Sequence, residues 1–410
     1  MPGENTEGLR RLGTKSFGNV ILEKERIGEW ASMETTESGM PVKKQKLKRS
    51  IIDTDIHGSA PREELLKYMP RIYREQVATF GWRLPTQGGM FLNGGTNGSM
   101  QDIKLPRNDT HEDNYLNYVR EHHLEKYNIE YGIMTGGGYE VHAATDTDFA
   151  AAVCSAHNDY YIERYLSREN RLKGSILIPK QDPVLSVKEI DRVGHHPGMV
   201  QVVVSNGAQK PYGQRFYHPI YEACVRHDLP FTIHVSMEGI GINNPPTGAG
   251  HVTSYIEYRS ARAQIMMAHL ASFIFEGVFD KYPTLKLVMM EAGMLWIAPL
   301  LWRLDEDWKA LRHQTPWVKE PPSEYYRKHV YVTSQPLELP PKAELIKPMF
   351  EAIHAETNLM FASDFPHWDF DSPLHAFPKL DEETWDSIFY RNAARLYRLP
   401  QRKGAEEATA

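Results

Sequence analysis

Short apolar runs that alternate with helical stretches constrain the fold of this chain more than any other feature. Eight runs of five to eight residues, rich in Ile, Val, Leu, Met or Phe, have the character of strands covered on both faces. They lie at 51–55, 129–135, 172–179, 199–205, 231–235, 285–291, 329–334 and 359–364. Helical stretches are expected at 148–168, 187–193, 218–227, 254–282 and 341–356. This alternation predicts an α/β fold that closes as a (β/α)8 TIM barrel rather than remaining an open sheet.

The two ends of the chain differ in composition from its centre. Residues 1–49 are polar, of mixed charge, and end in the basic run KKQKLKR, while residues 401–410 are also polar. We therefore expect an N-terminal arm over 1–49, a barrel over 50–400 and a tail over 401–410. The arm is expected to be solvated or to wrap a partner subunit. The glycine-rich stretch 86–99 is either a surface loop or a lid over the barrel mouth.

Composition argues against several classes of function. The chain has 410 residues and a net charge of -6, so it lacks the basic field of a nucleic-acid binder. It has no run of 18 apolar residues and no signal-peptide core, so no membrane partner is expected. Cys154 and Cys224 are its only cysteines, too few for a disulfide framework or a thiolate metal site. This usage predicts a cytoplasmic protein.

Metal-binding residue types occur where the expected strands end. Asp55 and His57 end the first strand, His234 ends the fifth and Asp364 ends the eighth. Side chains alternate along a strand, so Asp55 and His57 point into the same space, and parallel barrel strands all end at one mouth. Two imidazoles and two carboxylates suit Zn, Mn or Fe. The sequence therefore predicts a divalent metal ion held by Asp55, His57, His234 and Asp364.

Two further residues extend this predicted site. Glu291 ends the sixth run, where it can be a general base, a ligand to a second metal ion or a structural residue. His367 follows Asp364 by three residues and is expected to fold back to the site, either to a second metal ion or to a contact with a ligand.

Other polar residues near the predicted strands receive mainly structural interpretations. Asp53 is expected on the same face as Asp55 and deeper in the barrel, as a partner of a ligand or as a buried acid. His122 and His123 are expected on a helix surface, and His269 in the packed core.

Several of these motifs together resemble a known family. They are Asp55-x-His57, His234, the stretch 277–293 (GVFDKYPTLKLVMMEAG) with Trp296 and Arg303-Leu-Asp305, and Ser363-Asp-Phe-Pro-His367. They are similar to the amidohydrolase superfamily, and more closely to its group containing aminocarboxymuconate semialdehyde decarboxylase and the resorcylate and carboxyvanillate decarboxylases. The resemblance covers about residues 50–397 and implies a metal-bearing (β/α)8 barrel. Its metal ligands map onto Asp55, His57, His234 and Asp364.

The sequence departs from the family pattern at two positions. The first motif is commonly His-x-His or Glu-x-His, whereas this chain has Asp55-x-His57, which leaves the metal open among Zn, Mn and Fe. The sixth strand normally presents a histidine that acts as base or polariser, whereas this chain has Glu291. A glutamate carboxylate cannot act as a cationic hydrogen-bond donor, so the role of this position differs.

The predicted site is compatible with several reactions. A divalent ion can polarise a substrate oxygen or lower the pKa of a bound water. The first leads to non-oxidative decarboxylation of a small aromatic or unsaturated organic acid, which the resemblance favours. The second leads to hydrolysis, with Glu291 or Asp364 taking the proton. A non-haem iron or di-iron oxygenase, and an inactive barrel subunit of a complex, are further alternatives.

The expected partners follow from this interpretation. We expect a small-molecule substrate, no nucleic acid and no membrane. A homo-oligomer is predicted, with association with a related subunit as an alternative.

Overall fold

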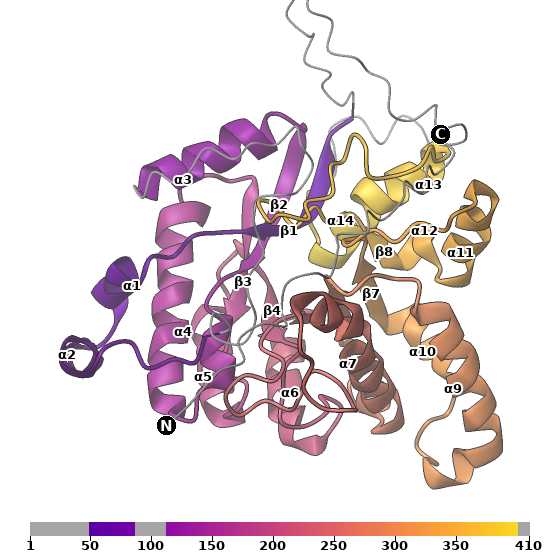
Figure 1. Cartoon of the computed structure of the whole chain (residues 1–410), viewed down its shortest axis with the longest axis horizontal. Helices are drawn as coiled ribbons and strands as arrows, with labels where there is room; N and C mark the ends of the chain where they lie inside the picture. Colours follow the sequence, from indigo (N-terminus) through magenta and orange to yellow (C-terminus); the bar gives the residue numbers. More distant parts are fainter. Residues whose placement is uncertain (1–48, 87–111, 401–410) are drawn as a thin grey trace, which may run out of the picture. The chain divides into compact units, whose positions relative to one another are not determined.

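A computed structural model of the protein describes residues 49–86 and 112–400. Its strands form one eight-stranded parallel sheet in the order β1 to β8, so each strand lies beside the next one in the sequence (Figure 1). The strands are β1 (Ile51–His57), β2 (Ile129–Gly136), β3 (Leu172–Leu177), β4 (Met199–Ser205), β5 (Phe231–His234), β6 (Leu287–Met290), β7 (Val330–Thr333) and β8 (Leu359–Met360). All eight predicted strands are present.

The sheet closes on itself between its last and first strands. The β8 ladder is only two residues long, but the chain continues beside β1 as far as Phe365. Backbone bonds join the two segments: Thr54 N–H donates to Phe361 O at 3.0 Å, Asp364 N–H to Asp55 O at 3.1 Å, and His57 N–H to Phe365 O at 2.7 Å. The predicted (β/α)8 barrel is therefore confirmed.

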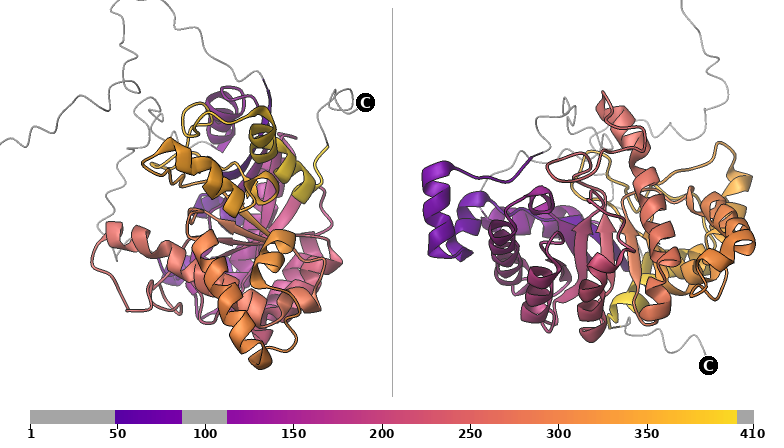
Figure 2. Two further views of the ribbon diagram at one scale, coloured as in Figure 1. Left: turned by 90° about the vertical axis from the view of Figure 1, so that its right-hand side faces the viewer. Right: turned by 90° about the horizontal axis from the view of Figure 1, so that it is seen from below.

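Helices surround the strands in both views of Figure 2. They are α1 (Arg62–Tyr68), α2 (Arg71–Phe80), α3 (Glu112–Val119), α4 (Thr147–Tyr161), α5 (Pro183–Val193), α6 (His218–Arg226), α7 (Tyr255–Phe275), α8 (Val278–Lys281), α9 (Ile297–Leu311), α10 (Pro322–His329), α11 (Ile346–Ala352), α12 (Ala355–Asn358), α13 (Glu382–Asp386) and α14 (Asn392–Tyr397). The π-helical turn η2 (Arg120–Leu124) leads into β2. None of the helices within 49–86 and 112–400 has the length and hydropathy of a membrane span.

The predicted helix at 254–282 is two helices in the structure. Ser254 caps the first, α7, through a capping box with Glu257, in which each side chain bonds to the backbone of the other residue. Gly277 then adopts φ +71, a left-handed conformation that glycine accepts readily, and α8 begins after it.

An apolar cluster occupies part of the barrel interior. It joins Ile52, Ile133, Met290 and Met360 from four strands to Tyr397 of α14, and all are nearly or fully buried. Helix α14 therefore covers the end of the barrel where the strands begin. A larger cluster packs the outer faces of the strands against the surrounding helices.

Polar side chains form a satisfied layer inside the barrel. Gln201 is fully buried, and its Oε1 accepts hydrogen bonds from Thr232 Oγ1 at 2.6 Å and from Tyr397 Oη at 2.8 Å. Its amide donates to Ser175 Oγ at 2.8 Å. Each polar side chain of this layer has a hydrogen-bond partner. The layer therefore links three strands to α14 without leaving a buried polar group unpaired.

Several predictions concern residues outside the described ranges. The arm over 1–49 lies outside apart from its last residue, as does the whole tail over 401–410. Of the glycine-rich stretch 86–99, only Thr86 lies within the described ranges. These predictions stay untested.

Candidate metal centre

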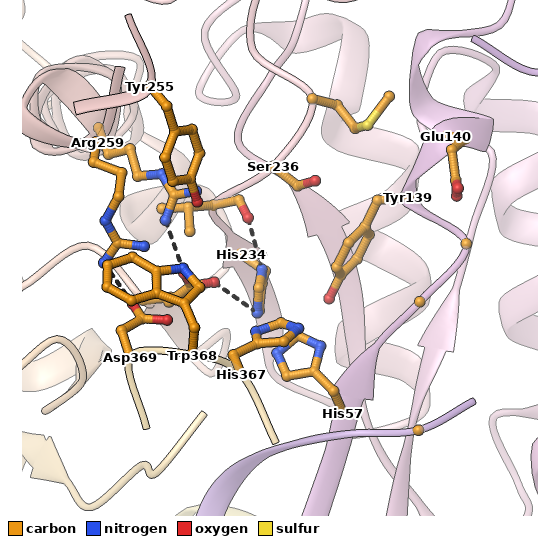
Figure 3. A pocket seen from close by; sticks show the side chains of 17 residues that line it. His57, Tyr139, Glu140, His234, Ser236, Tyr255, Arg259, His367, Trp368 and Asp369 are labelled. Atoms are coloured by element: carbon orange, nitrogen blue, oxygen red, sulfur yellow. Dashed lines mark hydrogen bonds and ion pairs between the residues drawn. The ribbon is translucent and has the colours of Figure 1, made fainter. Parts of the chain in front are cut away.

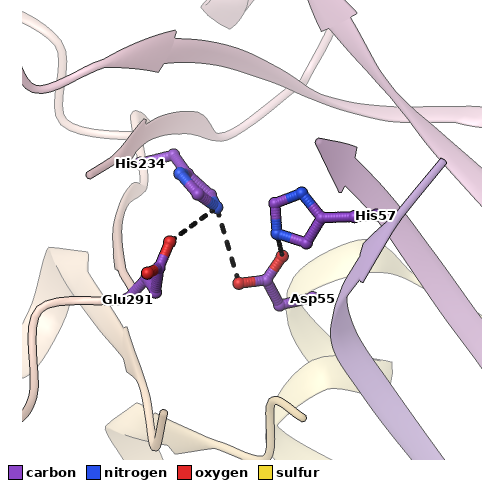
Figure 4. A group of neighbouring side chains, drawn as sticks. All are labelled: Asp55, His57, His234 and Glu291. Carbon is purple, nitrogen blue, oxygen red and sulfur yellow. Dashed lines mark ion pairs between the residues drawn. The ribbon is translucent and has the colours of Figure 1, made fainter. Parts of the chain in front are cut away.

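Four predicted site residues meet at the barrel mouth where the strands end. Asp55, His57, His234 and Glu291 are all buried, and one donor atom from each lies within 4.8 Å of the others (Figure 4). His234 Nε2 lies 3.6 Å from Asp55 Oδ2 and 3.4 Å from Glu291 Oε2. His57 Nε2 lies 3.4 Å from Asp55 Oδ1. Residues from strands far apart in the sequence therefore share one centre.

Asp364 lies against this group rather than inside it. Its Oδ1 is 2.8 Å from His57 Nε2 and 2.7 Å from His367 Nδ1. It forms overlapping groups of neighbouring donor atoms, one with His57 and His367 and another with Glu291 and Asp369. The structure thus brings Asp364 and His367 to the same mouth.

The donor atoms of this centre fit a divalent cation. Asp55 Oδ2, His57 Nε2, His234 Nε2 and Asp364 Oδ1 are buried and make no hydrogen bond within the described part of the chain. His57 Nε2 and His367 Nδ1 form ion-pair contacts with Asp364 Oδ1 at 2.8 and 2.7 Å, but neither contact has the geometry of a hydrogen bond. Buried polar atoms without partners are costly. An ion bound between them would satisfy all four, and the mixed oxygen and nitrogen donor set suits Mn, Fe or Zn.

Neighbouring groups orient the candidate ligands. His234 Nδ1–H donates to Val235 O at 2.9 Å, which leaves Nε2 free to bind an ion. Thr135, at the end of β2, donates through Oγ1 to Asp55 Oδ1. The ring of Tyr139 stacks on His234 with 5.0 Å between the centroids.

The carboxylates create an anionic field at the centre. Burial lowers the pKa of His234, but Asp55, Glu291 and Asp364 together raise it to about 9. Burial and the neighbouring His367 lower the pKa of His57, which favours the neutral imidazole that binds metals. A field that attracts a proton to His234 Nε2 also attracts a divalent cation.

Glu291 occupies a strained position beside an arginine. Its backbone φ is +59, in the left-handed region that non-glycine residues seldom adopt. Its Oε1 accepts a hydrogen bond from Arg262 Nη1 at 2.8 Å. Burial and Asp364 raise the pKa of Glu291 to about 8, although Arg262 and His234 favour the charged form.

Asp53 does not share the face of Asp55, so the predicted facing is wrong, but Asp53 is fully buried, so the alternative of a buried acid is confirmed. Ile52 and Asp55 both face the barrel interior although they are three residues apart. The pairing of β1 with β2 shifts register between Asp53 and Ile56, which breaks the two-residue alternation. Asp53 therefore faces away from the mouth.

The partners of Asp53 correct a second prediction. His123, expected on a helix surface, is fully buried, and its Nε2 lies 2.6 Å from Asp53 Oδ2. Asp53 Oδ1 also accepts from the Ser363 backbone N–H at 3.0 Å. His269 is packed in the core as predicted, where its Nε2–H donates to Asn206 O at 2.8 Å.

A cavity of about 410 Å3 opens over the centre. Its lining includes four residues of the centre: His57, His234, Glu291 and His367. The ring centroids of His57 and His367 lie 3.9 Å apart (Figure 3). Its remaining walls include Gly137, Gly138, Tyr139, Glu140, Tyr255, Arg259, Arg262, Trp368 and Asp369.

The wall residues on α7 were not singled out from the sequence. Arg259 and Arg262 are three residues apart, the spacing that places two side chains on one face of a helix. The guanidinium of Arg259 lies 4.6 Å from the ring centroid of Trp368 and also pairs with Asp369. The i, i+3 spacing was visible in the sequence, but the facing of this helix towards the mouth was not.

Known proteins match this chain in both sequence and fold. The amidohydrolase family model matches residues 52–399. The γ-resorcylate decarboxylase of Polaromonas sp. (strain JS666) is 25% identical over 298 residues, covering 67% of this chain and 85% of that protein. The γ-resorcylate decarboxylase of Rhodococcus jostii is 24% identical over 308 residues, covering 68% of this chain and 87% of that protein.

A solved structure shares the barrel architecture. The 5-carboxyvanillate decarboxylase of Novosphingobium aromaticivorans, crystallised with manganese and 4-hydroxy-3-methoxy-5-nitrobenzoic acid, is similar with a TM-score of 0.63 and 19% identity. The match covers 86% of this chain and 97% of that one. At this identity the similarity shows a common fold. The family model spans most of the chain and confirms the resemblance seen in the motifs: the chain belongs to the amidohydrolase family.

Proposed function

We propose that this protein is a metal-dependent decarboxylase of a small aromatic acid. The observation that carries the proposal is the set of four buried donor atoms without hydrogen bonds, two of which belong to His57 and His234 in the lining of the cavity. The γ-resorcylate decarboxylases that match most of the chain provide the reaction class. A cavity of about 410 Å3 is at the small end of the range for small-molecule sites, which suits a substrate with one ring.

Asp55, His57, His234 and Asp364 are the residues that would hold the ion, with Glu291 as a further oxygen donor. Manganese is the favoured metal because the carboxylate-rich donor set suits a hard cation and because the 5-carboxyvanillate decarboxylase was crystallised with it. A bound divalent ion supplies Lewis-acid polarisation of a substrate oxygen.

The chain's own residues would position the ring and supply a proton. Loss of CO2 breaks the bond between ring and carboxylate and leaves its electron pair on the ring carbon, which must then take a proton. We assign this delivery to His367, which lines the cavity, is half-exposed and pairs through Nδ1 with Asp364. Trp368 in the cavity wall would provide an aromatic contact for the substrate.

The proposed reaction can be tested by product analysis. Protein loaded with Mn2+ is incubated with 2,6-dihydroxybenzoate and, separately, with 5-carboxyvanillate, and CO2 and the ring product are measured. We expect decarboxylation of a hydroxylated aromatic acid that stops after chelation and returns with Mn2+. Metal loading without turnover of any hydroxylated aromatic acid, together with turnover of an ester or amide, would instead identify a hydrolase. Two iron ions with O2 uptake would identify an oxygenase, and absence of metal an inactive subunit.

Cytoplasmic location and homo-oligomeric assembly, including the alternative of a related subunit, remain part of this proposal. The arm over 1–49 motivates the assembly, since polar arms of this kind can wrap a partner subunit. Light scattering on the full chain and on a variant lacking residues 1–45 tests it. We expect the full chain to be larger than a monomer and the deletion to reduce its mass; a monomer in both cases contradicts the proposal.

A further inference from the structure

The Glu291 carboxylate presents its two oxygens to two different neighbours. Oε1 accepts a hydrogen bond from Arg262 Nη1 at 2.8 Å, and Oε2 lies 3.4 Å from His234 Nε2. The side chain is only 7% exposed, so water cannot replace either contact freely. One oxygen is therefore held by an arginine while the other faces the metal centre.

Neighbouring side chains hold Arg262 in place. Its guanidinium lies 5.1 Å from the ring centroid of Tyr258, one turn earlier on α7. The Tyr258 hydroxyl donates to Glu238 Oε2, and Glu238 is 1% exposed. Glu238 and Glu291 both favour the positive charge of Arg262. This bracing restricts the directions in which the guanidinium can point.

Arg262 provides the permanent positive charge beside Glu291, whose other oxygen faces the candidate ligand His234. Within the described ranges, Arg262 is the only lysine or arginine that pairs with Glu291. Arg259 also faces the cavity, but it pairs with Asp369 and stacks on Trp368. Removing Arg262 would leave a buried carboxylate without its fixed counter-charge, which is costly and frees the side chain to turn.

We propose that Arg262 is a positioning residue of the metal centre, which holds Glu291 so that Oε2 joins Asp55 and Asp364 as a third carboxylate oxygen facing the ion. This inference rests on the proposed metal-dependent function. Glu291 directly follows β6, whereas Arg262 lies on α7, so the pair joins two elements at the barrel mouth. Three carboxylates make the donor set harder than two, so the pair favours Mn2+ over the softer Zn2+.

Metal affinities of four variants test this role without relying on activity. Arg262→Met removes the charge, Arg262→Lys keeps it without the planar fork, Glu291→Gln removes the carboxylate, and the double variant Arg262→Met/Glu291→Gln combines two changes. Arg303→Met is the matched control, because Arg303 is exposed on α9 and pairs with Asp307. Dissociation constants for Mn2+ and Zn2+ are measured by chelator competition, and folding by circular dichroism.

We expect Arg262→Met to weaken Mn2+ binding about 10–100-fold, as for other residues that orient ligands, and to weaken Zn2+ binding less. Arg262→Lys should recover part of the loss because it restores the charge. Glu291→Gln should behave like Arg262→Met, and the double variant should be no weaker than either single variant. Arg303→Met should bind both ions as the parent does.

Two results would overturn the inference. One is a folded Arg262→Met with parental affinities for both ions. The other is a double variant whose losses add, because independent residues contribute additively. If Arg262→Met does not fold, parental Mn2+ affinity in Glu291→Gln overturns it equally. Failure of the proposed function gives different patterns. Without a metal ion at this site, Asp55→Asn and His234→Ala would also retain bound Mn2+, whereas with a metal ion but no decarboxylation the affinities expected above would still be found.

Discussion

At the scale of single residues, the candidate site is built from groups whose surroundings override their ordinary preferences. Glu291 and Asp364 both have positive φ, at +59 and +61. Such a conformation costs about 1–3 kcal/mol and persists where the surrounding structure fixes it, often at functional sites. Burial opposes ionisation of Asp364, but His367 and His57 hold its pKa below the ordinary value. Both strained residues therefore face the same charged centre.

The sequence alone placed most of these residues correctly because their position depends on strand ends. The positions of Asp55, His57 and His234 could be predicted from the two-residue alternation of side chains along a strand and from the common mouth at which parallel strands end. Asp53 was misplaced because a register shift in β1 cannot be read from its own residues. His123 was misplaced because its partner lies 70 residues away in the sequence.

His234→Ala tests the ligand assignment at this scale. The change removes Nε2 from the centre of the group, so we expect metal retention to fall by at least about 10–100-fold. Metal content after gel filtration, measured by mass spectrometry, gives the result. His227→Ala is the control, because His227 pairs with Asp191 at the surface. Parental metal content in His234→Ala would show that this histidine is not a ligand.

At the scale of secondary-structure elements, the strands were predicted better than the helices. Buried parallel strands leave continuous apolar runs, whereas helix ends depend on local backbone geometry. Gly277, whose left-handed conformation ends one helix, divides a stretch predicted as a single helix. Helices α9, α10 and α14 were not predicted, and their burial depends on the barrel around which they pack.

Ser254→Ala tests the start of α7, the helix that carries Arg259 and Arg262. Loss of the capping box should lower the free energy of unfolding by about 1 kcal/mol. Urea unfolding measures the change. Ser260→Ala, in the same helix, removes only a bond to the Ile256 carbonyl and serves as the control. Equal stability of the two variants would show that the cap does not stabilise α7.

Glu169→Gln tests an ion-pair link between η2 and the start of β3. The Glu169 carboxylate accepts hydrogen bonds from Arg171 at 2.8 Å and from Arg120 at 2.9 Å. These bonds, of which the one from Arg171 has the larger effect, lower the pKa of Glu169 from 4.5 to about 2. A lowered folded-state pKa contributes stability above pH 4.5 that is lost as pH falls towards 2. Solvent screening reduces this contribution to about 1–2 kcal/mol at pH 7.

Urea unfolding of Glu169→Gln and the parent between pH 7 and pH 3 gives the result. We expect the parent to be more stable at pH 7 and the difference to shrink below pH 4.5. A difference that stays constant over this range would show that the Glu169 charge does not stabilise the fold. Glu163→Gln is a suitable control, because Glu163 is 60% exposed and its contact with Arg164 is 3.8 Å.

At the scale of the whole barrel, the sequence predicted the architecture because eight strands alternating with helices have few other ways to bury their apolar faces. It did not predict which segment covers the end of the barrel opposite the site. Helix α14 does so, and the hydrogen bond from Tyr397 to the buried Gln201 links it to the interior. That contact joins residues 196 positions apart, so it cannot be predicted from a local sequence pattern.

Tyr397→Phe tests the contribution of this closure. The change removes one buried hydrogen bond to Gln201 Oε1 while Thr232 remains bonded to the same atom. We therefore expect a loss of about 1 kcal/mol in the free energy of unfolding, with metal binding unchanged. Denaturant unfolding and metal content measure the two effects. Unchanged stability would mean that the polar layer does not hold α14 in place.

We propose that side chains from distant strand ends share one ion at the barrel mouth. Anomalous diffraction from crystals of the Mn2+-loaded protein would locate this ion. We expect an anomalous peak about 2.0–2.3 Å from donor atoms of Asp55, His57, His234 and Asp364. A loaded crystal with no peak at the mouth, or with its peak bound by other residues, would contradict it.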